Sequence, residues 1–285
     1  MTRQIRTETT KLNQCAVLAM LLCLPAASDL GVRSDANANE IERNLNATFQ
    51  GRILILRNFY RGPRLRFDQS GDLRKGGPLG SWTVAGKVEV EKIRVKNQLL
   101  RIEGKRVLLV YDQDRKRFRN VRGNPVVIEM ELPQDPRTAE ALNPVLKKVF
   151  LAAGEQVCDI VPDHWKTYCI GEQDPDRSFQ DVEKLKDALR SQWQDGTPPT
   201  SVFRPWPPYS DEARQAGVGG VTVLLVSVDA QGNVTGVRVV TPLGMGLDDQ
   251  AVETIKTWKY QPATQRGVPV AVRVMVEIEF RTSGR

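Results

Sequence analysis

The sequence predicts an α+β protein in two parts, a β-rich domain with two helices followed by a small C-terminal module. The first observation is the alternation between Val270 and Phe280, where every second side chain is apolar. A strand with this pattern has one face on a core and the other in water, which is typical of an antiparallel sheet. The second observation is size, because 285 residues, 40% of them hydrophobic, supply apolar surface for two modest cores.

Residues 1–28 are expected to be an export signal. A basic start precedes an apolar run from Cys15 to Leu24, and Pro25-Ala26-Ala27-Ser28 supplies the small residues of a cleavage site. The run is shorter than the roughly 20 apolar residues that span a bilayer. We therefore expect an exported, soluble protein; the alternative is that the segment stays uncleaved and anchors the protein in a membrane.

Removal of the signal leaves two cysteines, Cys158 and Cys169. An even pair in an oxidising compartment predicts a disulfide that closes a short loop. Two alternatives stay open, free thiols and a metal site built from the cysteines with His164, Asp159 and Asp163. The spacing of these residues does not match the common zinc motifs.

Residues 40–195 are expected to form the β-rich domain. Apolar, β-branched segments recur from about residue 51 to residue 132, separated by turns such as Gly123-Asn124-Pro125. This pattern predicts a compact antiparallel sandwich or barrel. Two helices follow, one with Asn143 as its N-cap before Pro144 and one starting at Ser178.

The net charge of +7 has its basic excess in residues 40–135, with arginine clusters around Arg64 and Arg117. Such clusters can bind anionic partners, such as lipid headgroups or an acidic protein. The favoured interpretation is a solvated strand face, since Glu and Asp are interspersed throughout. The region shows no nucleic-acid-binding motif, and we expect no nucleic acid partner.

A proline-rich segment, residues 196–208, separates the two parts. It begins with Gly196-Thr197-Pro198-Pro199 and contains three further prolines. Prolines this dense neither continue a helix nor enter a sheet interior, so we expect an extended, semi-rigid linker.

The C-terminal module, residues 209–283, reads as a short helix, a hairpin, a second helix and a final strand. The hairpin strands are Gly220–Asp229 and Val234–Val240, so the final strand can add only on an outer side. An outer strand leaves backbone groups free to pair with an extended partner. The side chains expected near that partner are Arg273, Met275, Glu277 and Glu279. The alternatives are an edge that is capped or paired in a homodimer, and a polar face in water.

Six short pieces of sequence follow one another in this module. They are Tyr209 with Ala213-Arg214, Gly220-Val221-Thr222-Val223, Asp229-Ala230-Gln231-Gly232-Asn233-Val234, Leu247-Asp248-Asp249-Gln250-Ala251, Trp258-Lys259-Tyr260-Gln261-Pro262-Ala263 and the alternation that ends at Phe280. In this order they resemble the C-terminal domain of the TonB energy-transducer family, over about residues 207–280. The resemblance implies a periplasmic domain with two helices on a three-stranded antiparallel sheet. It also implies that the domain grips an extended segment of an outer-membrane receptor and relays force from an inner-membrane proton-driven complex.

The sequence departs from that family in its first part. Family transducers carry a longer membrane anchor and a long spacer, whereas this chain has a short apolar run and a folded domain, and Ser210 stands where proline is common. A second hypothesis is therefore a periplasmic interaction or scaffold protein that binds another envelope protein without energy transduction. Catalysis is not expected, because the chain has one histidine and no phosphate loop, zinc signature or hydrolase elbow. No cofactor is expected either.

Overall fold

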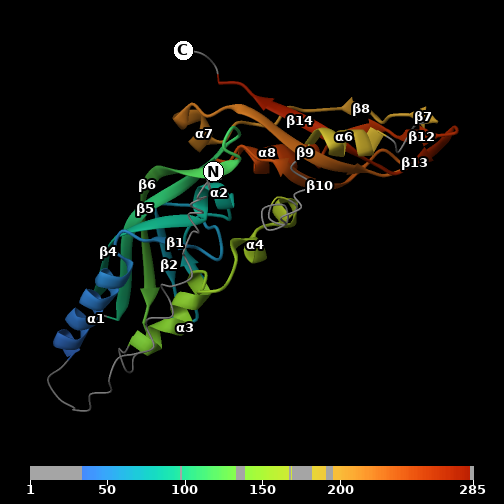
Figure 1. The fold of residues 1–285 in the computed structure, drawn as a ribbon. Coiled ribbons are helices and arrows are strands. Elements are labelled where there is room, and N and C mark those ends of the chain that lie inside the picture. The colour runs from blue at the N-terminus through green and yellow to red at the C-terminus, as the bar shows by residue number, and fades with distance from the viewer. Residues whose placement is uncertain are drawn as a thin grey trace, which may run out of the picture.

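The computed structural model describes residues 34–96, 98–132, 139–166, 168, 182–190 and 195–282 (Figure 1). The predicted export signal, Cys169 and the predicted helix start at Ser178 lie outside these residues. Within the described ranges we find no helix that combines the length and the apolar character needed to span a bilayer.

A mixed sheet forms the body of the N-terminal part. Its strands are β1 (Ile53–Ile55), β2 (Arg64–Phe67), β3 (Leu73–Lys75), β4 (Lys87–Lys96), β5 (Leu99–Asp112) and β6 (Arg117–Glu131). They lie in the order β1-β4-β5-β6-β2-β3, and all neighbours are antiparallel except β2 and β6, which run parallel. The predicted sandwich or barrel is therefore wrong. The described strands form one open sheet, and helices rather than a second sheet cover its apolar face.

Two helices, α1 (Ser34–Phe49) and α3 (Ala139–Val149), supply the apolar side chains that pack on this sheet. Helix α1 was not predicted, and its Asn46 side chain both donates to the Ile93 carbonyl (2.7 Å) and accepts from the Ile93 N–H (2.8 Å). Helix α3 contains Pro144, so the prediction of Asn143 as its N-cap is wrong. A proline inside a helix removes one backbone hydrogen bond. Burial of Leu142 and its apolar neighbours against the sheet offsets that loss.

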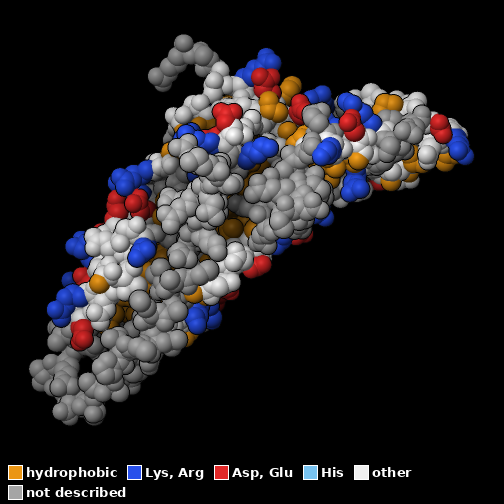
Figure 2. All heavy atoms as spheres, viewed as in Figure 1, with side chains coloured by type: hydrophobic (Ala, Val, Ile, Leu, Met, Phe, Trp, Pro, Cys, Tyr) orange, Lys and Arg blue, Asp and Glu red, His pale blue; other side chains and the backbone are white. Residues whose placement is uncertain are grey.

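The opposite face of the sheet carries paired charges. Arg101 donates to Glu103 (2.9 Å) and to Glu129 (2.7 Å), and its side-chain hydrogen bond is the main cause that lowers the pKa of Glu103. Lys and Arg are interspersed with Asp and Glu over the visible face of the molecule in Figure 2 rather than gathered in one patch. Water on one side and apolar helices on the other account for the alternation along these strands.

The C-terminal module contains α7 (Asp211–Ala216), β9 (Gly220–Val228), β10 (Val234–Thr241), α8 (Leu247–Ile255) and β14 (Val272–Phe280). The three strands form an antiparallel sheet in the order β10-β9-β14, which leaves β14 at one side. The turn between β9 and β10 is closed by Asp229, whose carboxylate accepts the N–H groups of Gln231 (2.9 Å) and Asn233 (2.8 Å). The described protein is thus a mixed α+β structure.

The proline-rich segment, expected to be a linker, is extended and paired with the module. Strand β7 (Gly196–Thr197) pairs with β12 (Ala263–Gln265), which in turn pairs with β13 (Val268–Val270). Strand β8 (Thr200–Phe203) pairs with β11 (Lys259–Gln261). Pro198 and Pro199 fall between β7 and β8, so they do not occupy ladder positions that need an N–H.

The two parts of the chain share one hydrophobic core. It joins Trp82 of α2 (Trp82–Ala85), Leu109 of β5 and Trp165 to buried side chains of β9, α8 and β14. The helices α4 (Val157–Ile160) and α6 (Val182–Arg190) belong to the segment that connects the N-terminal sheet to β7. Figure 1 shows an elongated arrangement, with the N-terminal sheet at one end and the β12–β13 hairpin at the other.

Candidate functional site

Strand β14 has one paired edge. It pairs with β9 without interruption from Val272 to Phe280, and among the described strands none pairs with its other edge. Of the side chains expected to face a partner, Arg273, Glu277 and Glu279 are exposed and Met275 is half-buried. The structure therefore places these four residues along one strand.

Glu277 and Glu279 hold ion pairs within the chain. Glu277 accepts from Lys186 of α6 at 2.7 Å, and Glu279 accepts from Arg281 at 2.7 Å. The pairing with Arg281 lowers the pKa of the Glu279 carboxyl. Neither partner was predicted from the sequence.

A groove of about 480 Å³ runs along this edge of β14. One wall consists of consecutive β14 residues from Val274 to Glu277, and the facing wall is formed by residues of the proline-rich segment, Pro198, Pro199, Ser201 and Arg204. Consecutive residues of a strand point to opposite faces. A groove lined by four in a row must therefore follow the edge of the strand rather than one face of the sheet.

Aromatic rings and a cation complete the groove. Trp258 and Tyr260 line it, and the Arg204 guanidinium lies 4.9 Å from the Trp258 ring centroid and 5.6 Å from that of Trp206. Burial raises the pKa of Tyr260 to about 12. The Trp258 indole N–H donates to the Pro205 carbonyl at 3.0 Å, which fixes the ring. Cation–π contacts of this kind hold an arginine side chain in place.

Sequence reasoning missed the contribution of Arg204 to this groove and the exposed aromatic residues next to it in the chain. Phe203 and Trp206 are large apolar side chains that are 55% and 67% exposed. Large exposed aromatic residues are typical of surfaces that bind a partner. The available signal was the pair of aromatic residues that flanks an arginine and a proline in Phe203-Arg204-Pro205-Trp206.

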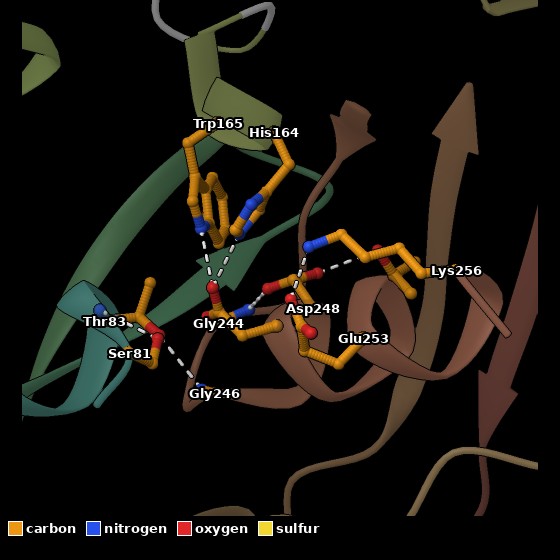
Figure 3. A network of polar contacts seen from close by, with 11 residues as sticks. Ser81, Thr83, His164, Trp165, Gly244, Gly246, Asp248, Glu253 and Lys256 are labelled. Carbon is orange, nitrogen blue, oxygen red and sulfur yellow. Dashed lines mark hydrogen bonds and ion pairs between the residues drawn. The ribbon is translucent and has the colours of Figure 1, made fainter. Parts of the chain in front are cut away.

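A second arrangement of polar contacts joins the N-terminal part to the loop between β10 and α8, and we call it the interdomain junction. The Tyr111 N–H donates to the Leu243 carbonyl and the Met245 N–H donates to the Leu109 carbonyl, both at 2.8 Å. The Gly246 N–H donates to the Thr83 hydroxyl at 2.9 Å. Figure 3 shows Thr83 beside Gly246 at this junction. Backbone groups of β5 and one side chain of α2 thus hold this loop by hydrogen bonds.

Asp248 holds the loop between β10 and α8 in place by hydrogen bonds. Its carboxyl group accepts the N–H groups of Leu243 (2.8 Å) and Gly244 (2.7 Å) and lies 2.7 Å from the Thr222 hydroxyl. The side chain is fully buried, and this burial raises the pKa of Asp248 to about 7. The loss of water around the charged form outweighs the hydrogen bonds that favour it.

His164 and Trp165 reach the same region from a helical turn at residues 163–166 (Figure 3). His164 Nε2 lies 2.8 Å from Asp249 Oδ1, and the Trp165 indole N–H donates to the same oxygen at 3.1 Å. His164 was considered as a metal ligand from the sequence, but it faces α8. Within the described ranges, no group of three or more His, Cys, Asp or Glu residues is placed to hold a metal ion.

Residues 205–282 match the family model described as Gram-negative bacterial TonB protein C-terminal. This segment is a TonB C-terminal domain. The TonB protein of Vibrio cholerae serotype O1 is 38% identical over 79 residues, which are 27% of this chain and 32% of that protein. The TonB protein of Xanthomonas campestris pv. campestris strain B100 is 40% identical over 75 residues, which are 26% of this chain and 34% of that protein.

The match therefore spans about a third of the length of these curated relatives. A solution structure of the Pseudomonas aeruginosa TonB C-terminal domain shares 18% identity, with a TM-score of 0.26, over 32% of this chain and 91% of that one. The resemblance predicted from the sequence is confirmed for residues 205–282.

Ser210, the departure noted in the TonB-like pattern, has a structural role. Its hydroxyl accepts the Ala213 N–H at 3.2 Å as the N-cap of α7 and donates to the Met245 carbonyl at 2.5 Å. Serine at an N-cap satisfies a backbone donor that the helix itself leaves unpaired. In this TonB domain the residue thus ties α7 to the loop of the interdomain junction.

Cys158 is disulfide-bonded. Its predicted partner, Cys169, lies outside the described residues, and the pairing stays a prediction.

Proposed function

We propose that this is a periplasmic protein whose TonB C-terminal domain binds an extended segment of an outer-membrane transporter and serves energy-dependent transport. The observation that supports the proposal is the unpaired edge of β14, bordered by a groove along Val274 to Glu277. The proposed role is binding, without a catalytic step.

The proposed mode of binding is strand addition. An incoming peptide would pair its backbone with the outer N–H and C=O groups of β14, and each such hydrogen bond contributes about 0.5–1.5 kcal/mol. Alternate side chains of the peptide would then face the row with Arg273 and Met275 or the row with Val274 and Val276. The groove volume of about 480 Å³ suits a few residues of such a peptide.

Strand addition can be tested on the peptide, which leaves the protein unchanged. Synthetic peptides of about ten residues, copied from the periplasm-facing N-terminal segments of Gram-negative outer-membrane transporters, are titrated into the full chain. Every second amide of a binding peptide is then N-methylated, in one register or in the other. We expect one register to lose affinity at least about tenfold, since its N–H groups point at β14, and the other to bind like the parent.

Equal affinity of the two methylated registers would show that side chains alone hold the peptide. Absence of binding by any peptide of the set would count against the proposed partner. Fluorescence anisotropy of a labelled peptide measures both outcomes.

A second candidate function is an interaction or scaffold protein that uses the same edge without energy transduction. The observation that favours it is the attachment of the TonB domain to the N-terminal part through a shared core and through β7 and β8. A domain held in this way is not carried on a free spacer. Fractionation separates the candidates: retention in the inner membrane supports transduction, and a soluble form that starts near Asp29 supports the scaffold role.

A further inference from the structure

Helix α6 lies at the same groove as the edge of β14. Lys186, Leu189 and Arg190 of α6 line the groove together with Val274 to Glu277. The Lys186 ammonium donates to Glu277 Oε1 at 2.7 Å, and Leu189 is 5% exposed. Figure 1 shows α6 against the C-terminal sheet, although α6 comes before the proline-rich segment in the sequence.

We propose that α6 is a built-in competitor that covers the β14 edge at the wall of the groove and must be displaced before a partner strand pairs along the full length of β14. This inference rests on the proposed function, because it concerns the regulation of the same edge. The competitor is a segment of the chain itself, held at the wall of the groove by the ion pair to Glu277 and by the burial of Leu189. A peptide that follows the edge from Val274 to Glu277 meets the side chains of Lys186 and Leu189.

The contacts of α6 are suited to reversible displacement. The ion pair joins side chains that are 24% and 52% exposed, and a pair in contact with water is weak and easily exchanged. The helix has nine described residues, a length at which a helix is marginal without tertiary contacts. Burial of Leu189 therefore contributes more than the ion pair to keeping α6 in place, and Lys186 positions the helix beside Glu277.

The consequence for affinity follows from the competition. A peptide that binds only the state without α6 has its affinity reduced by the fraction of molecules in that state. Weakening α6 should raise the affinity for the peptide by the same factor. If α6 were instead a wall that contacts the peptide, weakening it would lower the affinity.

The test uses the full chain with the variants Leu189→Ala and Lys186→Gln. We expect Leu189→Ala to bind the transporter-derived peptide about tenfold more tightly than the wild type, and Lys186→Gln about threefold more tightly. The control is Glu253→Gln on α8, with a side chain that is 67% exposed and outside the groove lining, which should bind like the wild type. Unchanged or weaker binding by both variants overturns the proposal, while the proposed function stands.

A second measurement does not depend on any peptide. Hydrogen exchange of the β14 amides on the edge away from β9 should be faster in Lys186→Glu than in the wild type. The charge swap that combines Lys186→Glu with Glu277→Lys should restore the wild-type exchange rate. Faster exchange with rescue supports the competitor even if no peptide binds, in which case only the proposed function fails. Identical exchange in the wild type and Lys186→Glu overturns the competitor.

Discussion

The hydroxyl group of Thr222 lies between two acceptors, the Asp248 carboxyl at 2.7 Å and the Thr241 carbonyl at 3.0 Å. One hydroxyl hydrogen satisfies only one of them. If Asp248 carries a proton, it donates to Thr222, and Thr222 donates to Thr241. The remaining lone pairs of the carboxyl group accept the N–H groups of Leu243 and Gly244. A neutral Asp248 therefore satisfies every group, in agreement with its raised pKa of about 7.

Asp248 should make the protein less stable as pH rises. Its pKa in the folded protein, about 7, lies above the ordinary value of 3.8, so between these values the folded state holds a proton that the unfolded state has lost. The stabilisation is complete below about pH 4 and disappears towards pH 7, with an amplitude on the order of 4 kcal/mol. Asp248→Asn removes this titration, at the cost of one poorly paired Leu243 N–H.

Urea unfolding at about pH 5 and about pH 8 measures the difference. We expect the wild type to exceed Asp248→Asn in stability at the lower pH and the gap to narrow at the higher one. Glu253→Gln, at a side chain that is 67% exposed on the same helix, is the control and should follow the wild type at both values. Parallel profiles of the wild type and Asp248→Asn would show that the carboxyl group is ionised throughout.

At the scale of the elements, β5 of the N-terminal part can lie close to the loop between β10 and α8 because Gly244 has no side chain. Gly244 has a φ of +90°, and an added Cβ would lie 2.1 Å from the Leu109 carbonyl oxygen of β5. Val110 and Gly244 form an antiparallel bridge at this point. The close approach of the two backbones is possible only for glycine.

Gly244→Ala should therefore separate β5 from this loop, with a loss of stability on the order of 2–4 kcal/mol from strain and lost hydrogen bonds. The matched control is Gly236→Ala in β10, where the nearest atom to an added Cβ is the Ser227 side chain at 3.6 Å. Thermal unfolding and hydrogen exchange of the Tyr111 amide report the two effects. An equal, small effect of both substitutions would contradict the structure of the interdomain junction.

The sequence predicted best those elements whose pattern is local. The alternation of β14 and the turn at Asp229 identify the strand and the hairpin directly, because side-chain direction and turn geometry depend on adjacent residues. The predicted start of helix α3 lay too far along the sequence. Proline is common at helix starts, and whether Pro144 is tolerated inside a helix depends on tertiary burial.

Contacts between distant segments could not be predicted. The parallel pairing of β2 with β6 joins residues far apart in the sequence and has no local signal. The groove has the same origin, because its walls come from α6, the proline-rich segment and β14. The sequence pointed to the side chains of β14 but not to Lys186 or Arg204, which tertiary packing brings beside them.

At the scale of the whole molecule, the shared core makes the two parts depend on each other. Trp165 is fully buried and makes an edge-to-face contact with Trp82 at 5.4 Å between ring centroids, within the core that includes α8 and β9. Its indole N–H also donates to Asp249 of the TonB domain. The Trp165 side chain thus contacts both the N-terminal part and the TonB domain.

Trp165→Ala should uncouple the two parts. We expect a single calorimetric transition for the wild type and two separate transitions for the variant, with a loss of about 3–5 kcal/mol from the shared core. Ile102→Ala, in the core beneath α1 and α3, should lower the melting temperature without splitting the transition. Two transitions already in the wild type would mean that the parts unfold independently.

The pairing of β7 and β8 sets the order in which the molecule would yield to a mechanical load. Once the shared core and α6 have detached, a pull on the chain before residue 195 reaches the far tip of the TonB domain, where β7 is held by two residue pairs. It then reaches β8, which has three pairs with β11. Pro198, Ser201 and Arg204 form a wall of the groove. Tension that detaches this segment therefore also removes that wall beside β14. Tension from upstream would therefore weaken the proposed binding of a peptide to β14.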